Sequence, residues 1–227
     1  MENGQKMINS IQNAIVIGAT GLVGRALIKQ LNELSSCEQI TAVVRHYDVE
    51  LSQLEKVHQF VLEDFLLLND EDVHGHTHAF SCLGSTLKKA GSKVQFYNID
   101  YEINAHFADL FDGLEVHYLL VSALGANPKS PIFYNRVKGE LEQHIRELGL
   151  AKTSILQPSL LLGERLEQRL LESAIQRLYQ KMSHLVPDSF KYKPVTAEQV
   201  AHTMVVAAQH QTEKFEIYDN LRIQKAK

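Results

Sequence analysis

The stretch NAIVIGATGLVG, residues 13–24, joins a short apolar, β-branched run to a turn that contains three glycines. Apolar side chains then recur at helical spacing over residues 22–34. This pattern predicts a buried parallel strand over residues 13–18 that turns directly into a helix. A strand followed at once by a helix is the beginning of a βαβ unit, so the stretch indicates an α/β protein.

The three glycines of this turn, Gly18, Gly21 and Gly24, suit three different tasks. The first permits a tight bend, the second lets the backbone approach a pyrophosphate, and the third lets the helix pack close to the sheet. The free N–H groups at the helix start favour a phosphate there. The turn therefore predicts a dinucleotide site, with glycines that serve packing alone as the alternative.

Further strand-like runs follow, separated by segments with helical spacing. They lie at residues 39–45, 57–62, 78–83, 116–122 and 153–157. Apolar residues at steps of three or four predict a long helix with one buried face, and these are Phe96, Ile99, Ile103, Phe107 and Leu110. Six strands with right-handed helical crossovers predict a doubly wound parallel sheet of the Rossmann type.

The length of 227 residues fits one α/β domain. Within it we expect a nucleotide-binding core at residues 13–158 and a C-terminal helix and tail at 195–227, with the helix over 197–208. The looser pattern of residues 159–194 indicates an excursion that covers the substrate pocket rather than a second domain.

Composition excludes several classes of protein. With a net charge of −4 and no cluster of Lys and Arg, the chain is not expected to bind nucleic acid or anionic lipid. No apolar run reaches membrane-spanning length, and no cleavable signal is evident. The two cysteines, Cys37 and Cys82, do not form a CxxC pair. We therefore expect a cytoplasmic protein that acts on a small molecule, while the sequence does not indicate an oligomeric state.

The choice of nicotinamide cofactor depends on the end of the second predicted strand. An acidic residue there accepts hydrogen bonds from the adenosine ribose of NAD. Arg45 stands at this place, and a guanidinium group suits the 2′-phosphate of NADP. NADP(H) is therefore favoured. Asp48 keeps NAD(H) as the alternative, and Arg45 as a solvated charge at a strand end is the other interpretation.

A tyrosine and a lysine stand four residues apart after the fifth predicted strand. Tyr134 is the only tyrosine with a lysine at this spacing, and Lys138 shares its helix face. Ser122 ends the preceding strand, at the carboxyl edge where doubly wound folds bind ligands. An ammonium group beside a phenol lowers the phenol's pKa and suits it to proton transfer. These residues indicate carbonyl reduction, with a half-buried tyrosine and a solvated lysine as the alternative.

Several segments together resemble the atypical short-chain dehydrogenase/reductases, and more narrowly the subgroup that contains the Tat-interacting oxidoreductase. The resemblance covers residues 13–208 and rests on GATGLVG (18–24), SCLGST (81–86) with KAGS (89–92), VSALGANPKSPIFYNRVKGELE (121–142) and QPSLLLGERLEQR (157–169). It implies that Tyr134 is the catalytic acid/base and that Lys138 contacts the nicotinamide ribose. It further implies that NADP(H) is bound by Thr20, Gly21, Leu22, Val23, Arg45, Asp64, Leu83, Gly84, Leu161 and Arg169.

The chain also departs from the typical members of that family. The fourth predicted strand ends in Cys82-Leu83-Gly84 rather than Asn-Ala-Gly, and Asn104 is only a positional candidate for the helix Asn of the proton relay. A non-catalytic NADP(H)-sensing or protein-binding module is therefore the second hypothesis, and a small-molecule isomerase is the third. Arg165 and Arg169 also fit the exposed face of a helix, paired with Glu164 and Glu172.

Two further features are a set of three alternate histidines and a cysteine near the expected cofactor site. His74, His76 and His78 alternate in the sequence, but Gly75 and the acidic run before it indicate a loop, so we expect no metal site. Cys82 falls near the cofactor by topology. We expect it to be a small buried residue rather than a nucleophile, because no histidine is placed to activate it.

Overall fold

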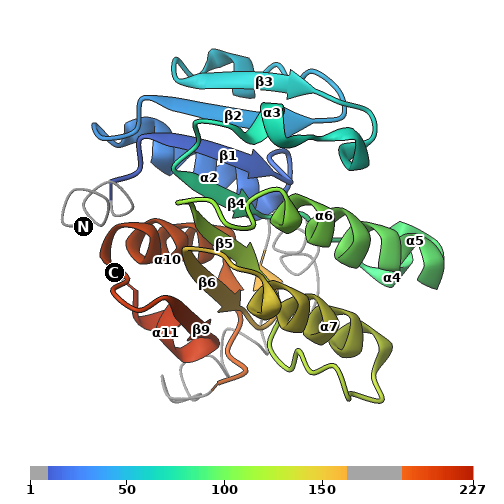
Figure 1. Ribbon diagram of the computed structural model, residues 1–227. Coiled ribbons are helices and arrows are strands. Elements are labelled where there is room, and N and C mark those ends of the chain that lie inside the picture. The colour runs from blue at the N-terminus through green and yellow to red at the C-terminus, as the bar shows by residue number, and fades with distance from the viewer. Residues whose placement is uncertain (1–9, 163–190, 227) are drawn as a thin grey trace, which may run out of the picture.

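A parallel β-sheet of seven strands forms the centre of the molecule (Figure 1). The computed structural model describes residues 10–162 and 191–226, so most of the expected excursion at 159–194, including Arg169, lies outside the described residues. The order β3-β2-β1-β4-β5-β6-β9 reverses direction between β1 and β4, which makes this point the topological switch of the sheet. The expected doubly wound α/β fold is confirmed.

The strands match the expected runs closely, with one addition. Their bounds are β1 Asn13–Ile17, β2 Gln39–Val44, β3 Val57–Val61, β4 His78–Ser81, β5 His117–Val121, β6 Lys152–Gln157 and β9 Phe215–Asp219. The strand β9 was not predicted, because its residues fall in the segment expected to hold a helix and a tail. Among the described strands it lies at the sheet edge and pairs with β6, and two of its five residues, Glu216 and Asp219, are charged, so its apolar signal is weak.

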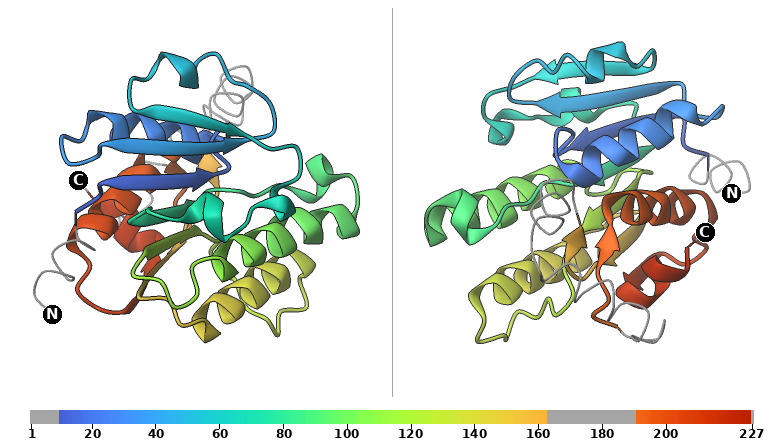
Figure 2. Two further views of the ribbon diagram at one scale, coloured as in Figure 1. Left: turned by 45° about the horizontal axis from the view of Figure 1, so that its top comes forward. Right: turned by 180° about the vertical axis from the view of Figure 1, so that it is seen from behind.

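Helices cover both faces of the sheet. One face carries α2 (Leu22–Glu33), α10 (Ala197–His210) and α11 (Asn220–Lys225), as Figure 2 shows from behind. The other face carries α3 (Asp70–Val73), α6 (Ile103–Asp109) and α7 (Phe133–Glu147). Each helix presents an apolar stripe to the sheet, and burial of these stripes is the main force that holds the layers together.

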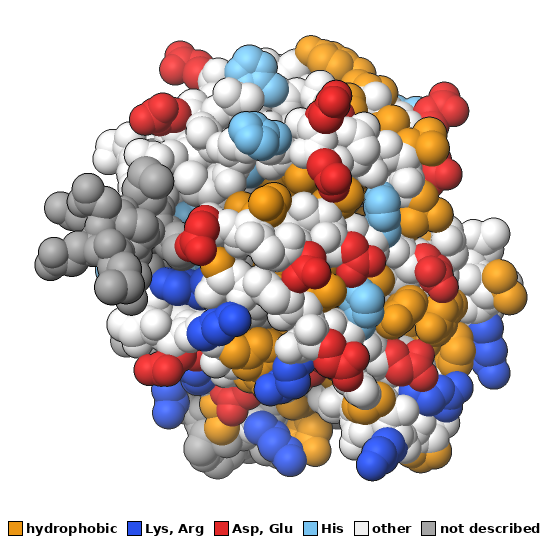
Figure 3. Space-filling view, viewed as in Figure 1, with side chains coloured by type: hydrophobic (Ala, Val, Ile, Leu, Met, Phe, Trp, Pro, Cys, Tyr) orange, Lys and Arg blue, Asp and Glu red, His pale blue; other side chains and the backbone are white. Residues whose placement is uncertain are grey.

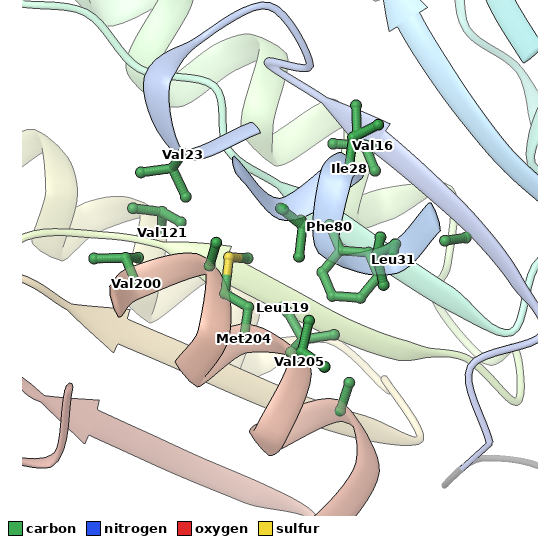
Figure 4. Packing of buried hydrophobic residues seen from close by; sticks show 14 of the residues in the cluster. Val16, Val23, Ile28, Leu31, Phe80, Leu119, Val121, Val200, Met204 and Val205 are labelled. Carbon is green, nitrogen blue, oxygen red and sulfur yellow. The ribbon is translucent and has the colours of Figure 1, made fainter. Parts of the chain in front are cut away.

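The face beneath α2 and α10 illustrates this packing (Figure 4). Ile28 and Leu31 of α2, together with Met204 of α10, lie against Phe80 of β4 and Leu119 of β5, and all five side chains are fully buried. Removing one large side chain of this kind costs about 2–5 kcal/mol of unfolding free energy. The sheet is thus a rigid base from which the loops at its carboxyl edge project.

The long helix expected over residues 96–110 is interrupted. A helix α5 (Lys93–Tyr97) leads into a π-helical turn at Asn98–Glu102, and α6 follows. A π-turn accommodates one extra residue, so the buried face moves forward by one position. Asp100 and Asn104 are therefore fully buried, where the sequence pattern placed Ile99 and Ile103.

The remaining elements are short. They are the single helical turns Leu51–Gln53 and Phe65–Leu67, the helix α4 (Leu87–Ala90), and a separate two-stranded parallel ladder of β7 (Leu161–Leu162) with β8 (Val195–Thr196). The expected C-terminal helix is α10, which extends two residues beyond the expected end at residue 208.

On the face seen in Figure 3, Lys and Arg side chains lie over the lower part, interspersed with Asp and Glu, and the upper part shows Asp, Glu and His side chains. This mixture agrees with a net charge of only −4. Within the part of the chain that the structure describes, no helix combines the length and the apolar character needed to cross a bilayer.

Candidate active site

The glycine loop lies at the carboxyl end of β1, and the surrounding backbone requires its glycines. Gly18 has a φ of +72°, and a Cβ there would lie 2.5 Å from the carbonyl carbon of Cys82. A Cβ on Gly24 would lie 2.2 Å from the carbonyl oxygen of Gly18. Both distances are far below van der Waals contact, so neither position accepts a side chain without backbone movement.

The rim of this loop is open to solvent. Gly21 is the N-cap of α2, and no side chain caps the helix there. The first N–H groups of a helix have no partner within it. Thr20, Gly21 and Leu22 are exposed, whereas Val23 and Gly24 are buried in the joint with the sheet. An uncapped helix start behind an exposed glycine turn fits the diphosphate of a dinucleotide.

The end of β2 separates the two candidates for ribose recognition. Arg45 is exposed. The Asp48 carboxylate accepts two hydrogen bonds from the Arg25 guanidinium and further bonds from the N–H groups of Glu50 and Leu51. The Arg25 hydrogen bond holds the pKa of Asp48 below its usual range. Asp48 is thus already engaged with Arg25, while Arg45 projects into solvent.

Two further cofactor candidates follow β3 and β4, which are separated in the sheet by β2 and β1. Asp64 follows β3, is exposed, and caps the next helical turn by accepting from the N–H of Leu66 at 3.0 Å. Leu83 follows β4 and packs partly buried against the core beneath α6 and α7. The two residues therefore lie at the same edge of the sheet as the glycine loop.

Tyr134 and Lys138 lie on one face of α7. The Tyr134 ring packs against the Phe96 ring with their centroids 5.5 Å apart. Burial raises the pKa of the Tyr134 phenol, and the positive charge of Lys138 offsets part of that rise. Lys138 itself is 3% exposed. The ammonium group that the sequence analysis placed beside the phenol is therefore a buried charge, not a solvated one.

The partner of Lys138 is a residue that the sequence analysis did not single out. The Asp100 carboxylate lies 2.8 Å from Lys138 Nζ and also accepts from the N–H of Ser85 at 2.8 Å. A Cβ on Gly84 would lie 3.3 Å from Asp100 Oδ1. The π-turn, α7 and the loop after β4 therefore converge at this carboxylate.

Ser122 directly follows β5 at the same edge, but its proton is engaged. The Ser122 hydroxyl donates to the carboxylate of Glu142, which also accepts from Gln157 Nε2 at 2.9 Å. Burial raises the pKa of Glu142, and the hydrogen bond from Ser122 counteracts that rise. In this arrangement Ser122 can accept a hydrogen bond from a ligand but has no second proton to donate.

Asn104 joins β4 to α6 rather than facing the open edge. Its side-chain oxygen accepts a hydrogen bond from the Ser81 hydroxyl, and its Nδ2 donates to the carbonyl oxygen of Ile99 at 2.9 Å. Leu161 lies in β7, paired with Val195, and is partly buried against the core beneath α2 and α10. Arg169 lies outside the described residues, so its place in the site stays a prediction.

The three alternate histidines do not converge. His74 is exposed at the end of α3, His76 bridges Val73 O and Thr41 Oγ1, and His78 is buried in β4. Among the residues at 10–162 and 191–226, no group of three His, Cys, Asp or Glu side chains is arranged to hold a metal ion. A shallow hollow beside His74, lined by Asp70 and Glu71, lies at the opposite edge from the glycine loop.

Cys82 lies directly beneath the glycine loop. Its thiol contacts Met204 Sδ at 3.9 Å, and burial raises its pKa to about 12. A thiol in this state is not ionised at neutral pH, and the thiolate is the form that attacks electrophiles.

Solved structures share this architecture at low sequence identity. A UDP-glucuronic acid 4-epimerase from Bacillus cereus in complex with NAD has a TM-score of 0.66 and 13% identity over 92% of this chain and 77% of that one. Vestitone reductase from alfalfa has a TM-score of 0.60 and 15% identity over 91% of this chain and 76% of that one. At these identities the likeness shows a shared Rossmann-like fold.

The curated relatives are closer, whereas no family model matches the chain. Protein FMP52-1, mitochondrial, from Scheffersomyces stipitis is 33% identical over 204 residues, which cover 89% of this chain and 90% of the relative. Protein FMP52, mitochondrial, from Debaryomyces hansenii is 34% identical over 198 residues, which cover 85% and 86%. These names contradict the expected cytoplasmic location, which relied on the lack of an evident targeting signal. Because the similarity extends over most of both chains, this protein belongs to the FMP52 family.

Proposed function

We propose that this chain is an NADP(H)-dependent oxidoreductase of the short-chain dehydrogenase/reductase type, which reduces a carbonyl or similar group of a small molecule. One observation supports the proposal above the others. Tyr134 shares a face of α7 with the buried Lys138, whose Nζ lies against Gly84 in the loop after β4. The glycine turn, in which Gly18 and Gly24 have no room for a side chain, lies at the same sheet edge. A site for a dinucleotide and a site for proton transfer therefore adjoin each other.

The chemistry follows from the protonation state of the phenol. A bound nicotinamide supplies the hydride, which leaves negative charge on the substrate oxygen. Tyr134 donates its proton to that oxygen, and the raised pKa of the phenol keeps it protonated at neutral pH. The ammonium of Lys138 would bind the ribose of the cofactor and stabilise the phenolate that forms.

Ser122 takes part in this chemistry as a proton donor only if its hydroxyl changes its hydrogen-bond partner. To donate to a carbonyl oxygen, its hydroxyl must leave Glu142. Without that rotation, Ser122 accepts a hydrogen bond at most and orients the substrate less strongly. The remaining cofactor contacts proposed here are Thr20, Gly21, Leu22, Val23, Arg45, Asp64, Leu83, Gly84, Leu161 and Arg169.

The preference for NADP(H) over NAD(H) is supported by the occupied state of Asp48. A carboxylate that holds Arg25 at two oxygens, and two backbone N–H groups besides, has little capacity left for ribose hydroxyls. Arg45 is exposed at the end of β2 and can reach a 2′-phosphate.

The experiment is a panel of carbonyl compounds with NADPH, run on the wild type and on Tyr134→Phe. Loss of the proton donor is expected to lower kcat by about 10²–10⁴-fold while NADPH affinity, measured by calorimetry, stays within about twofold. Tyr101→Phe is the matched control, since Tyr101 is a half-buried tyrosine stacked on Tyr97. Equal turnover by the wild type and Tyr134→Phe would remove Tyr134 from the chemistry.

A non-catalytic NADP(H)-sensing module is the second candidate. The engaged states of Ser122 and Asn104 favour it, because neither side chain is free to pass a proton onward in this structure. Tight NADPH binding without turnover of any panel member, together with a protein partner whose affinity changes with NADPH, would select this candidate over the reductase.

Three finer assignments belong to the proposal as well. The mitochondrial names of the relatives support a mitochondrial location for this chain. The quoted motifs support membership of the subgroup that contains the Tat-interacting oxidoreductase. We also propose one domain, in which residues 159–194 cover the substrate pocket.

A further inference from the structure

The Asp100 carboxylate is the most enclosed charged group at the candidate site. Its residue is 0% exposed and sits in the middle of the π-turn Asn98–Glu102, a rare backbone form that often accompanies functional sites. Without the extra residue of that turn, the continuing α-helix would bring a different side chain to this position. The sequence therefore uses an irregular helix to place a carboxylate between α7 and the loop after β4.

This carboxylate makes polar contacts to two elements that must cooperate around a nucleotide. Oδ1 lies 2.8 Å from Lys138 Nζ, and Oδ2 accepts from the N–H of Ser85 at 2.8 Å. Gly84 leaves just enough room, because a Cβ there would lie 3.3 Å from Oδ1 and 3.5 Å from Nζ. One side chain thus ties a charged group of α7 to the backbone of the β4 loop.

The pair is also balanced in charge. Lys138 and Asp100 are both buried, so each charge depends on the other for compensation. Burial is the main cause of the raised pKa of the Tyr134 phenol; of the charges that act on it, the ammonium of Lys138 favours ionisation and the carboxylate of Asp100 opposes it. Glu142, one turn beyond Lys138 on α7, also interacts with that ammonium.

We propose that Asp100 is a positioning residue: it fixes Lys138 against the Gly84–Ser85 backbone as one wall of the nucleotide site. Its carboxylate holds that ammonium at 2.8 Å, on the α7 face that Lys138 shares with Tyr134, and there opposes ionisation of the phenol. The first half of this inference rests on the proposed binding of NADP(H). The second half concerns Tyr134 alone and holds with or without nucleotide. Asp100 touches neither hydride nor substrate in this role and acts through its neighbours.

The test uses the full chain with Asp100→Asn, which keeps the shape of the side chain and removes its charge. Ultraviolet titration of each protein minus its Tyr134→Phe counterpart isolates the ionisation of one phenol among eight tyrosines. In Asp100→Asn we expect about tenfold more tyrosinate at a given pH, because the opposing charge is gone. Calorimetry should show NADPH binding about tenfold weaker, because Lys138 has lost its anchor.

The matched control is Asp109→Asn, on the same helical run, where the carboxylate pairs with His144 at 2.7 Å and is far more exposed. It is expected to change neither measurement. A purely structural role for Asp100 would lower stability without moving the Tyr134 titration. An unchanged titration in folded Asp100→Asn would therefore overturn the inference.

A second variant covers the case in which Asp100→Asn does not fold. Asp100→Glu keeps the charge but displaces Lys138, so we expect weaker NADPH binding with an unchanged Tyr134 titration. Wild-type affinity for Asp100→Glu would overturn the positioning role. If the wild type itself binds no NADPH, the proposed function fails, whereas the titration still decides whether Asp100 controls the phenol.

Discussion

The two edges of the central sheet both bury polar side chains, yet they do so in different ways. At the amino edge, His117 Nε2 lies 2.8 Å from Ser154 Oγ, and that hydroxyl donates to Gln211. The Gln211 amide donates in turn to the carbonyl oxygen of Thr153 at 2.8 Å. We call His117, Ser154 and Gln211 the amino-edge cluster. Its bonds end on neutral acceptors, including the carbonyl oxygen of Gln211 that accepts from the buried Lys152 Nζ at 2.8 Å. Burial holds the pKa of His117 well below its ordinary value.

At the carboxyl edge the buried groups are charged. Asp100 and Lys138 form an ion pair, and Glu142 is a second buried carboxyl group one helical turn away. The backbone there is also packed so closely around Gly18 and Gly24 that neither position has room for a side chain. Hydrogen bonds between neutral groups stabilise a fold at little cost, whereas a buried ion pair carries a desolvation cost that pairing only partly offsets, which points to a purpose beyond stability.

Two tyrosines show that burial alone does not distinguish the edges. Burial raises the pKa of Tyr118, in the core, and that of Tyr134, at the carboxyl edge. The difference lies in their neighbours, since Tyr134 is under opposing influence from Lys138 and Asp100. Functional candidates in this fold are therefore best sought where a titratable group meets opposed charges, not where it is merely buried.

The largest effect is expected for a substitution of Gly18 at the carboxyl edge, and Gly75 at the amino edge is its reference. Gly18 and Gly75 both have positive φ, at +72° and +82°, but only Gly18 is crowded, with nothing within 4 Å of a Cβ on Gly75. Gly18→Ala is expected to lower the unfolding free energy by about 2–4 kcal/mol through strain and overpacking. It should also abolish measurable NADPH binding, because the glycine loop must move.

Gly75→Ala is the control for this comparison. It carries the same backbone strain without a clash, so the loss of stability is expected to be about 1 kcal/mol. Its NADPH affinity should match the wild type. Urea unfolding and calorimetry on the two variants provide both measurements, and normal NADPH binding by Gly18→Ala would show that the loop does not hold the diphosphate.

A smaller effect is expected at the end of β2. Arg45→Ala removes the exposed guanidinium assigned to the 2′-phosphate, so NADPH binding should weaken about tenfold or more. NADH binding should stay the same, since NADH lacks that phosphate. Arg222→Ala, which removes an exposed guanidinium paired with Glu216 at the far edge of the sheet, is the control. Tighter binding of NADH than of NADPH by the wild type would contradict the assignment.

Much of the fold follows from local pattern in the sequence. The buried parallel strands are continuous apolar runs, and the glycine turn marks the first strand–helix junction. The edge strand β9 was not predicted because two of its five residues are charged, and its pairing with β6 joins residues far apart in the chain. A regular helical spacing of apolar residues also does not reveal a π-turn, because that turn contains one more residue than a turn of α-helix.

The residues of the candidate site likewise divide into those that sequence spacing reveals and those that only the tertiary structure reveals. Tyr134 and Lys138 are four residues apart, so a helix brings them to one face and spacing is enough to find them. Asp100 is found only when the π-turn is known, because a regular helix would bury Ile99 instead. The pairing of Arg25 with Asp48 depends likewise on tertiary contacts that no spacing rule contains.

The smallest expected effect concerns the pH dependence of stability at the amino edge. The pKa of His117 is lowered by burial, with His78 and Lys152 acting in the same direction, so the unfolded chain binds a proton that the folded chain does not. Unfolding free energy should therefore fall as pH drops below about 6.5, by at most about 1.4 kcal/mol per pH unit.

His117→Gln, whose amide can still bond to Ser154, should flatten this slope, whereas substitution of the exposed His74 by Gln should leave it as in the wild type. Urea unfolding at pH 7, 6 and 5 measures all three proteins. Since the amino edge is remote from the glycine loop, NADPH affinity should be the same for His117→Gln and the wild type at pH 7. A His117 variant that kept the stability slope but lost NADPH affinity would reverse the division of roles between the two edges.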